Sequence, residues 1–313
     1  MNARLSVFLN PPLIAVCAVT FFGRLSAPGG VVVIEDDSVL MAFDSDSGAL
    51  TRMESKLRHW VIERRPELGV SFRLFAPLPE RRYNPVLGQR QHAVEVKKVS
   101  PNEVELQWKN LVSENGGTLP MALTTSVRLT NGVMVFDATL ENDSPLVVET
   151  IDYPYFGDFN PPRRDSLLEA RTLKEGKAGE FQANEVYPHF RNEKGYWGVS
   201  VPTKTLEGQQ SPFCLLQAPD QGLYIEMDNP KLPYRVQYTF EQHPGVISTA
   251  TSLVPQQDEF SGFPVHLEFR LCHFVFAQPH SRTNLVPVVL RCYDGDWHHG
   301  LALYQPPRQA SSH

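Results

Sequence analysis

The sequence predicts an all-β fold, built as one large two-layer antiparallel sandwich with few short helices. Apolar and polar residues alternate along several short runs, among them Val104–Trp108, Val133–Leu140 and Val265–Leu271. This period of two is typical of strands that have one buried face. The 313 residues also include 26 prolines, which indicates many turns and strand edges because proline is excluded from helix interiors and central strands. We find no linker between residues 30 and 290 and no internal repeat, so a single domain is the simplest architecture.

The first strands are predicted over Val31–Ile34, Val39–Phe43 and Ala49–Met53. Between the last two lies the polar run 44–48 (Asp-Ser-Asp-Ser-Gly), which favours a hairpin turn. Its alternating carboxylates also resemble a calcium loop, but the glycine comes early and no acidic residue follows at the spacing of a bidentate ligand. We therefore expect a turn at this point.

Further short strands are bounded by turn residues and are predicted over Val70–Phe75, Ala93–Val99, Val104–Trp108, Leu123–Leu129 and Val133–Leu140. Asn131-Gly132, between the last two, is a strong signal for a two-residue hairpin. In the run 57–63, Trp60 and Val61 favour a strand over a helical turn. The segment 165–176 has the best helix pattern of the central chain, with a loop across the mouth of the sandwich as the alternative.

The stretch 185–230 is rich in aromatic and proline residues. Tyr187-Pro188-His189 and Tyr196-Trp197 precede two expected strands, Phe213–Leu216 and Leu223–Met227, which are joined by a turn at 220–222. Flat aromatic faces beside amides and carboxylates suit sugar rings, whose C–H groups pack on aromatic planes while their hydroxyls form hydrogen bonds. The alternative is that these aromatic side chains belong to the core of the sandwich.

Residues 1–27 resemble an export signal. Arg4 provides a positive charge, Leu13–Phe22 is an apolar run of suitable length, and Leu25-Ser26-Ala27 offers small residues for cleavage. The sequence therefore predicts a secreted or periplasmic protein, with a retained N-terminal anchor as the alternative. Nothing after residue 30 is apolar over the length of a membrane span.

Charge and cysteine content limit which ligands and partners the sequence predicts. The formal net charge is −6 and no basic run exceeds two arginines, so nucleic acid is not an expected partner. Cys214, Cys272 and Cys292 lack the spacing of a zinc site, and we expect Cys214 and Cys272 to be buried free thiols. His298-His299 near Asp294 and Asp296 is interpreted as a helix start with Asp296 as the N-cap, so no metal is expected. There is no phosphate-binding glycine loop, and we expect no cofactor.

Three segments together resemble a known domain. The hairpin around Phe43-Asp44 and Gly48-Ala49-Leu50, the stretch from Tyr187 to Asp228, and the run 293–304 (YDGDWHHGLALY) are similar to parts of the galactose-mutarotase-like β-supersandwich. In several glycoside hydrolase families this domain precedes a catalytic (β/α)8 barrel. The resemblance implies a supersandwich over 30–291, followed by a linker or helix start over 292–313 that would lead towards a barrel.

The resemblance also has a departure. After Tyr304 only nine residues follow, whereas the similar enzymes continue into a barrel that carries most of their catalytic carboxylates. The expectation is therefore a truncated chain or an accessory domain without a complete catalytic centre. Glycoside hydrolysis needs two paired carboxylates, and the sequence alone does not pair its candidates, which are Asp152, Asp158, Asp165, Glu185, Glu226, Asp228 and Glu268.

Three functions remain open at this stage. The first is a carbohydrate-related accessory domain of a glycoside hydrolase-like protein, for which we expect binding residues at Tyr155, Tyr187, His189, Tyr196, Trp197 and Asp228. The second is a mutarotase-like sugar epimerase, which needs a His acid and a Glu base converging in one pocket. His189, His243, His266 or His273 would be the acid, and Glu226 or Glu268 the base. The third is a structural domain that packs on a barrel supplied elsewhere, which predicts an apolar face near residues 297–304.

Overall fold

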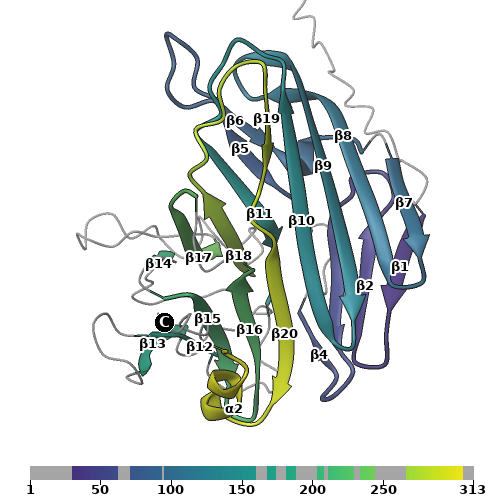
Figure 1. Cartoon of the computed structure of the whole chain (residues 1–313), viewed down its shortest axis with the longest axis vertical. Helices are drawn as coiled ribbons and strands as arrows, with labels where there is room; N and C mark the ends of the chain where they lie inside the picture. Colours follow the sequence, from purple (N-terminus) through teal and green to yellow (C-terminus); the bar gives the residue numbers. More distant parts are fainter. Residues whose placement is uncertain are drawn as a thin grey trace, which may run out of the picture.

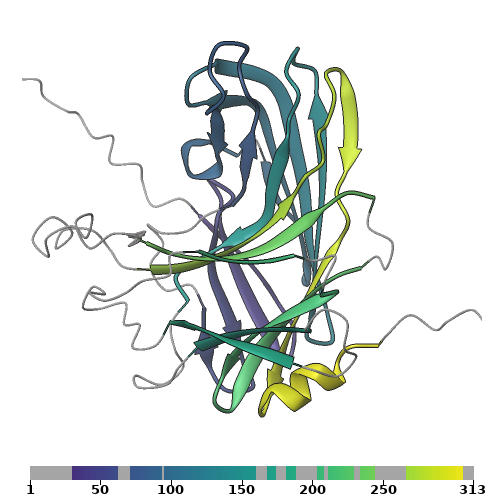
Figure 2. The same cartoon turned by 90° about the vertical axis from the view of Figure 1, so that its left-hand side faces the viewer.

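The computed structural model describes residues 30–62, 71–93, 95–159, 168–173, 181–187, 203–207, 211–228, 233–243 and 266–305, of which 173, 181–187, 203–207, 241–243 and 266 are described by their backbone alone. Over these ranges the chain forms three antiparallel sheets with little helix, as Figures 1 and 2 show. The expected all-β antiparallel sandwich is confirmed.

The strands divide among the three sheets as follows. The ten-stranded sheet contains β7 (Glu95–Ser100), β8 (Glu103–Ser113), β9 (Gly117–Thr130), β10 (Val133–Asn142), β12 (Leu168–Leu173), β13 (Phe181–Tyr187), β15 (Phe213–Ala218), β16 (Gln221–Met227), β19 (Ser281–Asn284) and β20 (Val288–Asp294). The six-stranded sheet contains β5 (Arg73–Phe75), β6 (Pro85–Leu87), β11 (Thr150–Phe156), β14 (Thr203–Glu207), β17 (Val236–His243) and β18 (His266–His273). The four-stranded sheet contains β1 (Val31–Glu35), β2 (Val39–Asp44), β3 (Leu50–Ser55) and β4 (Trp60–Val61).

Neighbouring strands are often distant in the sequence. The ten-stranded sheet has the order β13-β12-β15-β16-β20-β10-β9-β8-β7, with β19 also beside β10, so that β20 joins two groups of strands. Figure 1 shows β20 running beside both β16 and β10. The six-stranded sheet has the order β14-β17-β18-β11-β5-β6. This order places β11 between β18 and β5, which positions the site described below.

One large apolar core joins the three sheets. Phe72, just before β5, packs edge-to-face on Trp108 of β8, with ring centroids 4.9 Å apart. Phe136 of β10 stacks on Phe156 of β11 at 6.2 Å. The Trp108 indole N–H donates to the carbonyl of Ser47, between β2 and β3, at 2.9 Å. The ten-stranded sheet therefore packs against both smaller sheets, because apolar faces of all three must leave water.

The hairpins expected from local sequence are confirmed. The run 45–47 turns between β2 and β3, and Asp44 accepts hydrogen bonds from the backbone and hydroxyl of Ser47 at 2.8 and 2.6 Å. Asn131 and Gly132 connect β9 to β10 with positive φ values of 51° and 78°. Two successive positive φ values are what a tight hairpin turn of the Asn-Gly kind requires. The short strand at Trp60–Val61 is also present.

The expectation for the segment 165–176 is wrong where the structure describes it. Residues 168–173 form β12, which pairs with β13 on one side and β15 on the other. Leu168, Ala170 and Thr172 are buried, whereas Glu169 and Arg171 are partly exposed. Two neighbouring strands satisfy the backbone groups on both edges, so tertiary pairing outweighs a short helical pattern.

The helix near the end of the described chain is confirmed. The helix α2 (Trp297–Ala302) has Asp296 as its N-cap, and the Asp296 carboxylate accepts from the backbone N–H of His298 at 3.0 Å. A 3-10 turn, η2, covers Gly88–Arg90. No helix in the described ranges is long and apolar enough to cross a membrane.

The cysteine expectation holds in part. All three described cysteines are free, and Cys214 is buried as expected, but Cys272 is only partly buried. Cys272 lies on the outer face of β18, because Leu271 and His273 on either side of it face the core. Residues 1–29, which include the expected export signal, lie outside the described residues.

Candidate functional site

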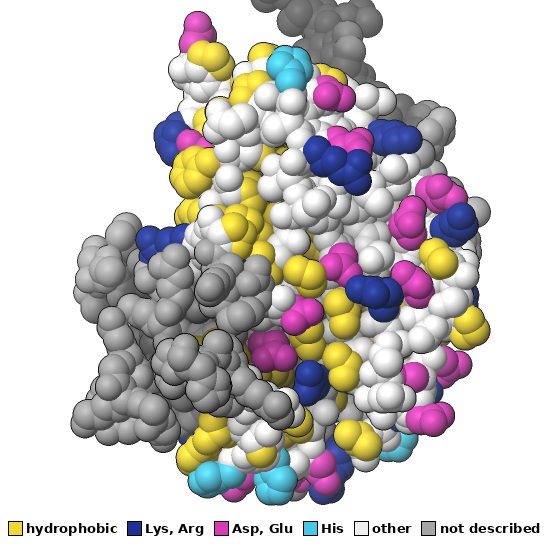
Figure 3. Space-filling model, in the orientation of Figure 1, with side chains coloured by type: hydrophobic (Ala, Val, Ile, Leu, Met, Phe, Trp, Pro, Cys, Tyr) yellow, Lys and Arg dark blue, Asp and Glu magenta, His cyan; other side chains and the backbone are white. Residues whose placement is uncertain are grey.

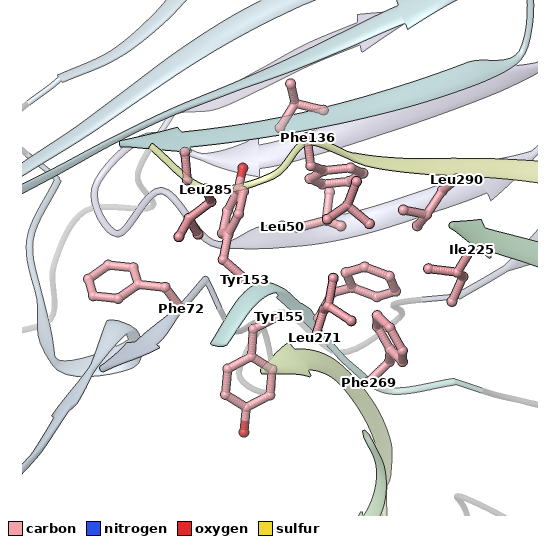
Figure 4. Close-up of a cluster of buried hydrophobic side chains, with 14 of the residues drawn as sticks. Leu50, Phe72, Phe136, Tyr153, Tyr155, Ile225, Phe269, Leu271, Leu285 and Leu290 are labelled. Atoms are coloured by element: carbon pink, nitrogen blue, oxygen red, sulfur yellow. The ribbon is translucent and has the colours of Figure 1, made fainter. Parts of the chain in front are cut away.

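A bulge in β11 directs neighbouring side chains to opposite faces of the six-stranded sheet. Between Asp152 and Tyr155 the register with β18 shifts, so two residues of β11 oppose one residue of its partner. Tyr153 and Tyr155, two residues apart, would share a face in a regular strand. Instead, Figure 4 shows their hydroxyls pointing in opposite directions, with Tyr155 directed away from the core cluster. The peptide bond between Tyr153 and Pro154 is cis.

The bulge completes a polar group on the outer face of this sheet. We define the outer-face cluster as Arg73 of β5, Asp152 and Tyr155 of β11, and Glu268 and Arg270 of β18. The Asp152 Oδ2 lies 2.6 Å from Arg73 Nε and 3.3 Å from Arg270 Nε. The Tyr155 hydroxyl donates to Glu268 Oε1 at 2.5 Å. Three strands that are far apart in sequence thus contribute two cations, two carboxyl groups and a phenol to one face.

Burial in the outer-face cluster is uneven. The Asp152 side chain is only 1% exposed, while Arg73 and Arg270 keep 21% and 15% of their side-chain surface accessible. Tyr155 and Glu268 are also buried. A buried carboxylate within ion-pair distance of two guanidinium groups restricts their orientation. The cluster therefore combines two partly accessible arginines with a buried carboxylate, a buried glutamate and a buried phenol.

The surroundings also keep two side chains on this face, Tyr155 and Cys272, protonated. Burial, together with the neighbouring Glu268 carboxyl group and despite the nearby Arg73, raises the pKa of Tyr155 well above its ordinary value. Tyr155 therefore stays a phenol that donates to Glu268 at any physiological pH. Burial and the nearby Asp152 carboxylate also raise the pKa of Cys272, so this thiol remains protonated and is a poor nucleophile.

His273, the histidine of this sheet whose side chain the structure describes, faces the core. His273 of β18 is fully buried on the core side, where Nε2 lies 2.7 Å from the Tyr153 carbonyl oxygen and Nδ1 lies 3.2 Å from the Tyr234 hydroxyl. Nε2–H therefore donates to Tyr153, and Nδ1 accepts from Tyr234. Burial lowers the pKa of His273 to about 4, so it is neutral at physiological pH. His273 and Glu268 lie on opposite faces and do not form an acid–base pair.

The site residues expected from sequence are distributed as follows. Tyr155 belongs to the outer-face cluster, but it is 7% exposed and is not the open aromatic plate that was expected. Asp228 is exposed at the end of β16, in the other layer, where its backbone N–H donates to the Pro287 carbonyl at 2.8 Å. The structure does not bring Asp228 to Tyr155. The side chains of the remaining four expected residues lie outside the described residues: Tyr187, His189, Tyr196 and Trp197.

Other candidate acids have local partners. Glu226 accepts from the Tyr224 hydroxyl at 2.5 Å and lies 3.7 Å from Arg291, on the ten-stranded sheet. Asp158 is buried, with a positive φ of 57°. Sequence reasoning did not single out Arg73 or Arg270. Arg270 alternates with the apolar residues of β18 and Arg73 stands beside Leu74 in β5, but neither pattern shows what the charge faces.

The described residues offer no metal centre. No group of three or more His, Cys, Asp or Glu side chains within them is arranged to hold a metal ion. Asp296 is already engaged as a helix cap and lies near the Nδ1 atoms of His298 and His299, at 3.1 and 3.2 Å. A cavity of about 20 Å³ within the core, lined by Phe43, Trp108 and Tyr153 among others, is large enough for one water molecule but not for a sugar.

Acidic and basic side chains mix on the described surface. On the face shown in Figure 3, Lys and Arg side chains are interspersed with Asp and Glu. That face therefore lacks the single-sign field that attracts a polyanion.

Solved structures of other proteins show the same fold as this chain, although no sequence match is found. No family profile matches this sequence, and no curated protein matches it in sequence. The structure is similar to a proposed aldose 1-epimerase from Escherichia coli K12, with a TM-score of 0.50 and 13% identity over 85% of this chain and 99% of that one. It is also similar to a galactose mutarotase-related enzyme from Lactobacillus acidophilus, with a TM-score of 0.49 and 10% identity over 85% of this chain and 98% of that one.

A larger enzyme is similar to this chain over part of its own length. The chain resembles the α-galactosidase AgaA from Geobacillus stearothermophilus, with a TM-score of 0.48 and 10% identity, over 86% of this chain and 41% of that enzyme. At these identities the likeness concerns the fold alone. The galactose-mutarotase-like β-supersandwich expected from the sequence is confirmed as the fold.

Proposed function

We propose that this chain binds carbohydrate on the outer face of its six-stranded sheet and serves as a non-catalytic, accessory domain of a glycoside hydrolase-like protein. The observation that carries the proposal is the outer-face cluster, in which Asp152 holds two arginines and Tyr155 holds Glu268. Sugar hydroxyls both donate and accept, and sites for neutral ligands use a few oriented polar groups of this kind. The fold supports the proposal by analogy only.

The arrangement favours binding over chemistry. A general acid–base mechanism needs two groups with separated pKa values within reach of one substrate. Among the described side chains, Glu268 faces Tyr155, and His273 lies on the core side of the sheet, while the side chains of the other two candidates on this sheet, His243 and His266, lie outside the described residues. A phenol whose pKa is raised is a poor proton donor to a sugar at neutral pH, and the single O–H of Tyr155 is already engaged with Glu268.

The test is calorimetric titration of the full chain with D-galactose, D-glucose, raffinose and maltotriose. We expect saturable binding of at least one sugar, and at least a tenfold weaker affinity for Arg73→Met, because this variant keeps the aliphatic stem and removes the donors. Arg128→Met is the matched control, since Arg128 lies on the ten-stranded sheet in an exposed pair with Asp137. The proposal is wrong if no sugar binds, or if both arginine variants weaken binding equally.

A mutarotase-like epimerase is the second candidate. The specific observation in its favour is that this chain matches 99% of the proposed aldose 1-epimerase, so that protein has this fold over its whole length. Polarimetry of freshly dissolved α-D-galactose decides between the two roles. An epimerase accelerates the optical change, and Glu268→Gln abolishes the acceleration, whereas an accessory domain leaves the rate at the buffer value.

A structural role beside a catalytic (β/α)8 barrel is the third. It predicts an open apolar face around residues 297–304. In the structure Trp297, Leu301 and Tyr304 are partly buried, and they pack on a small cluster that includes Phe213 and Tyr224. A barrel partner would therefore have to contact a different surface of the described chain, and co-purification with a separately expressed barrel would test for it.

A further inference from the structure

An exposed tyrosine stands beside the outer-face cluster on a firmly held loop. Tyr83, between β5 and β6, is 59% exposed, whereas its neighbour Asn84 is fully buried. The Asn84 side chain donates to the Ala76 carbonyl at 2.8 Å and accepts from the Asn115 backbone N–H at 2.9 Å. The Asn115 side chain in turn donates to the Tyr83 carbonyl at 3.0 Å. The loop is therefore anchored by buried hydrogen bonds while it holds a large aromatic ring in water.

This ring continues a row of flat groups that ends in the outer-face cluster. The Tyr83 ring meets Phe75 edge-to-face, with centroids 5.9 Å apart. The Arg73 guanidinium lies 5.2 Å from the centre of the Phe75 ring and 5.8 Å from that of Tyr155. Arg73 thus links the cluster to the aromatic pair, in the order Tyr155, Arg73, Phe75, Tyr83.

We propose that this row is a binding track for a neutral oligosaccharide, with one sugar residue at the outer-face cluster and a further one on the Phe75–Tyr83 pair. The inference rests on the proposed carbohydrate binding and extends it by naming the ligand class. An exposed aromatic ring held by a rigid loop is a platform of the kind that sugar C–H faces pack on, and little ordering entropy opposes its use.

The spacing along the row suits more than one sugar residue. Phe75 is paired with Thr150 on β11, and the cluster extends to Tyr155 on the same strand. The Arg73 guanidinium lies between the rings of Phe75 and Tyr155, 5.2 Å from the centre of Phe75 and 5.8 Å from the centre of Tyr155. The Tyr83 ring lies a further 5.9 Å from the Phe75 ring. Each step along the row is about the width of one sugar ring, so the successive flat groups offer contacts to more than one sugar residue.

The charges along the row indicate a neutral ligand. Asp152 lies 2.6 Å from Arg73, and Glu149 lies 2.7 Å from Arg82, the residue before Tyr83. Each of these arginines therefore already has a carboxylate at contact distance. An anionic sugar would have to compete with these carboxylates, whereas a neutral sugar would not.

The experiment compares ligand lengths on the full chain. Calorimetry with D-galactose, raffinose and stachyose, and with D-glucose, maltotriose and maltotetraose, gives the affinity gain from monosaccharide to tetrasaccharide within each series. We expect a gain of at least tenfold in one series for the unaltered chain. For Tyr83→Ala we expect the gain to fall to about twofold or less, and for Tyr83→Phe, which keeps the ring, to persist.

Matched variants separate the outcomes. Val112→Ala removes another exposed apolar side chain, on the ten-stranded sheet, and should leave the gain unchanged. The track is refuted if chain length brings no gain, or if Tyr83→Ala and Val112→Ala behave alike. If monosaccharides bind but longer sugars bind no better, only the track fails. If no sugar binds at all, the proposed function fails with it.

Discussion

The carboxylate of Asp152 connects two strands that are not adjacent, since its Oδ2 lies within ion-pair distance of Arg73 on β5 and Arg270 on β18. Removing a buried carboxylate beside two guanidinium groups lowers stability. The two arginines would stay partly withdrawn from water but would lose the negative charge that compensates for it. The remaining exposure of both arginines reduces the cost. Asp152 therefore ties the architecture of the six-stranded sheet to the chemistry of its outer face.

We predict that Asp152→Asn lowers the free energy of unfolding by about 2–3 kcal/mol, which is less than a fully buried pair would cost. The matched control is Asp137→Asn, whose pair with Arg128 is 2.8 Å long and has side chains 32% and 49% exposed. Its effect should stay within about 0.5 kcal/mol. Urea denaturation measures both, and equal losses would contradict the role given to Asp152.

His273 makes stability depend on pH. Its pKa is lowered by burial from 6.5 to about 4, so between these values the unfolded chain binds a proton that the folded chain does not. Above pH 6.5 the titration of His273 does not change the free energy of unfolding. As the pH falls from 6.5 towards 4, it lowers this free energy increasingly. We predict a loss of about 3 kcal/mol of stability from this residue across that window.

The measurement is denaturant unfolding at a series of pH values for the native chain and His273→Gln, which has groups to bond Tyr153 and Tyr234 but does not titrate. The variant should show a shallower dependence between pH 6.5 and 4. His280→Gln, at an exposed position, is the control and should keep the native slope. A native slope in His273→Gln would show that other groups dominate the acid sensitivity.

At the scale of elements, the turn between β2 and β3 is shaped by one close packing contact. Gly48 has a φ of +72°, and a Cβ placed on it would lie 2.5 Å from Cζ2 of the buried Trp108. Gly117 has a similar φ of +67°, but a Cβ there would meet nothing within 4 Å. The two glycines therefore share a backbone requirement and differ only in packing.

We predict that Gly48→Ala lowers the free energy of unfolding by about 3 kcal/mol or more, because overpacking against Trp108 adds to the backbone strain. Gly117→Ala should cost about 1 kcal/mol, from the positive φ alone. Thermal or urea unfolding gives both values. If the two costs were equal, the contact between this turn and Trp108 would not contribute to the stability of the four-stranded sheet on its partner.

Among the residues that the structure describes, two separate apolar clusters stabilise the molecule. The large one joins the three sheets, and a smaller one, with Phe213, Leu215, Tyr224 and Tyr293, lies beneath α2 on the outer face of the ten-stranded sheet. Because α2 covers this second cluster, the end of the described chain packs on its own domain. The proposed ligand site lies elsewhere, on the outer face of the six-stranded sheet.

Export is a prediction for the whole chain. If residues 1–27 are an export signal, the mature protein should begin close to residue 28 and be recovered outside the cytoplasm. Intact mass and N-terminal sequencing of the protein from a secreting host measure this. Replacing Leu13–Phe22 by a polar segment should abolish processing, whereas recovery of the uncleaved chain in the cytoplasm would contradict the prediction.

Local sequence patterns determined the strands and turns of this protein. The alternation of Met134, Phe136 and Leu140 gave the buried face of β10, Asn131-Gly132 specified its hairpin, and Asp296 capped α2. Each of these features depends on residues a few positions apart, whose backbone preferences and hydrophobic period are readable without knowledge of the rest of the chain.

The choice of neighbouring strands, and with it the position of the candidate site, came from long-range packing. Arg73 and Asp152 meet because β5 pairs with β11, and the register shift in β11 moves Tyr155 to the outer face although Tyr153 faces the core. The same long-range pairing made 168–173 a strand despite its helical pattern. Pairing partners and register depend on the burial of the whole sheet at once, so no local pattern contains them.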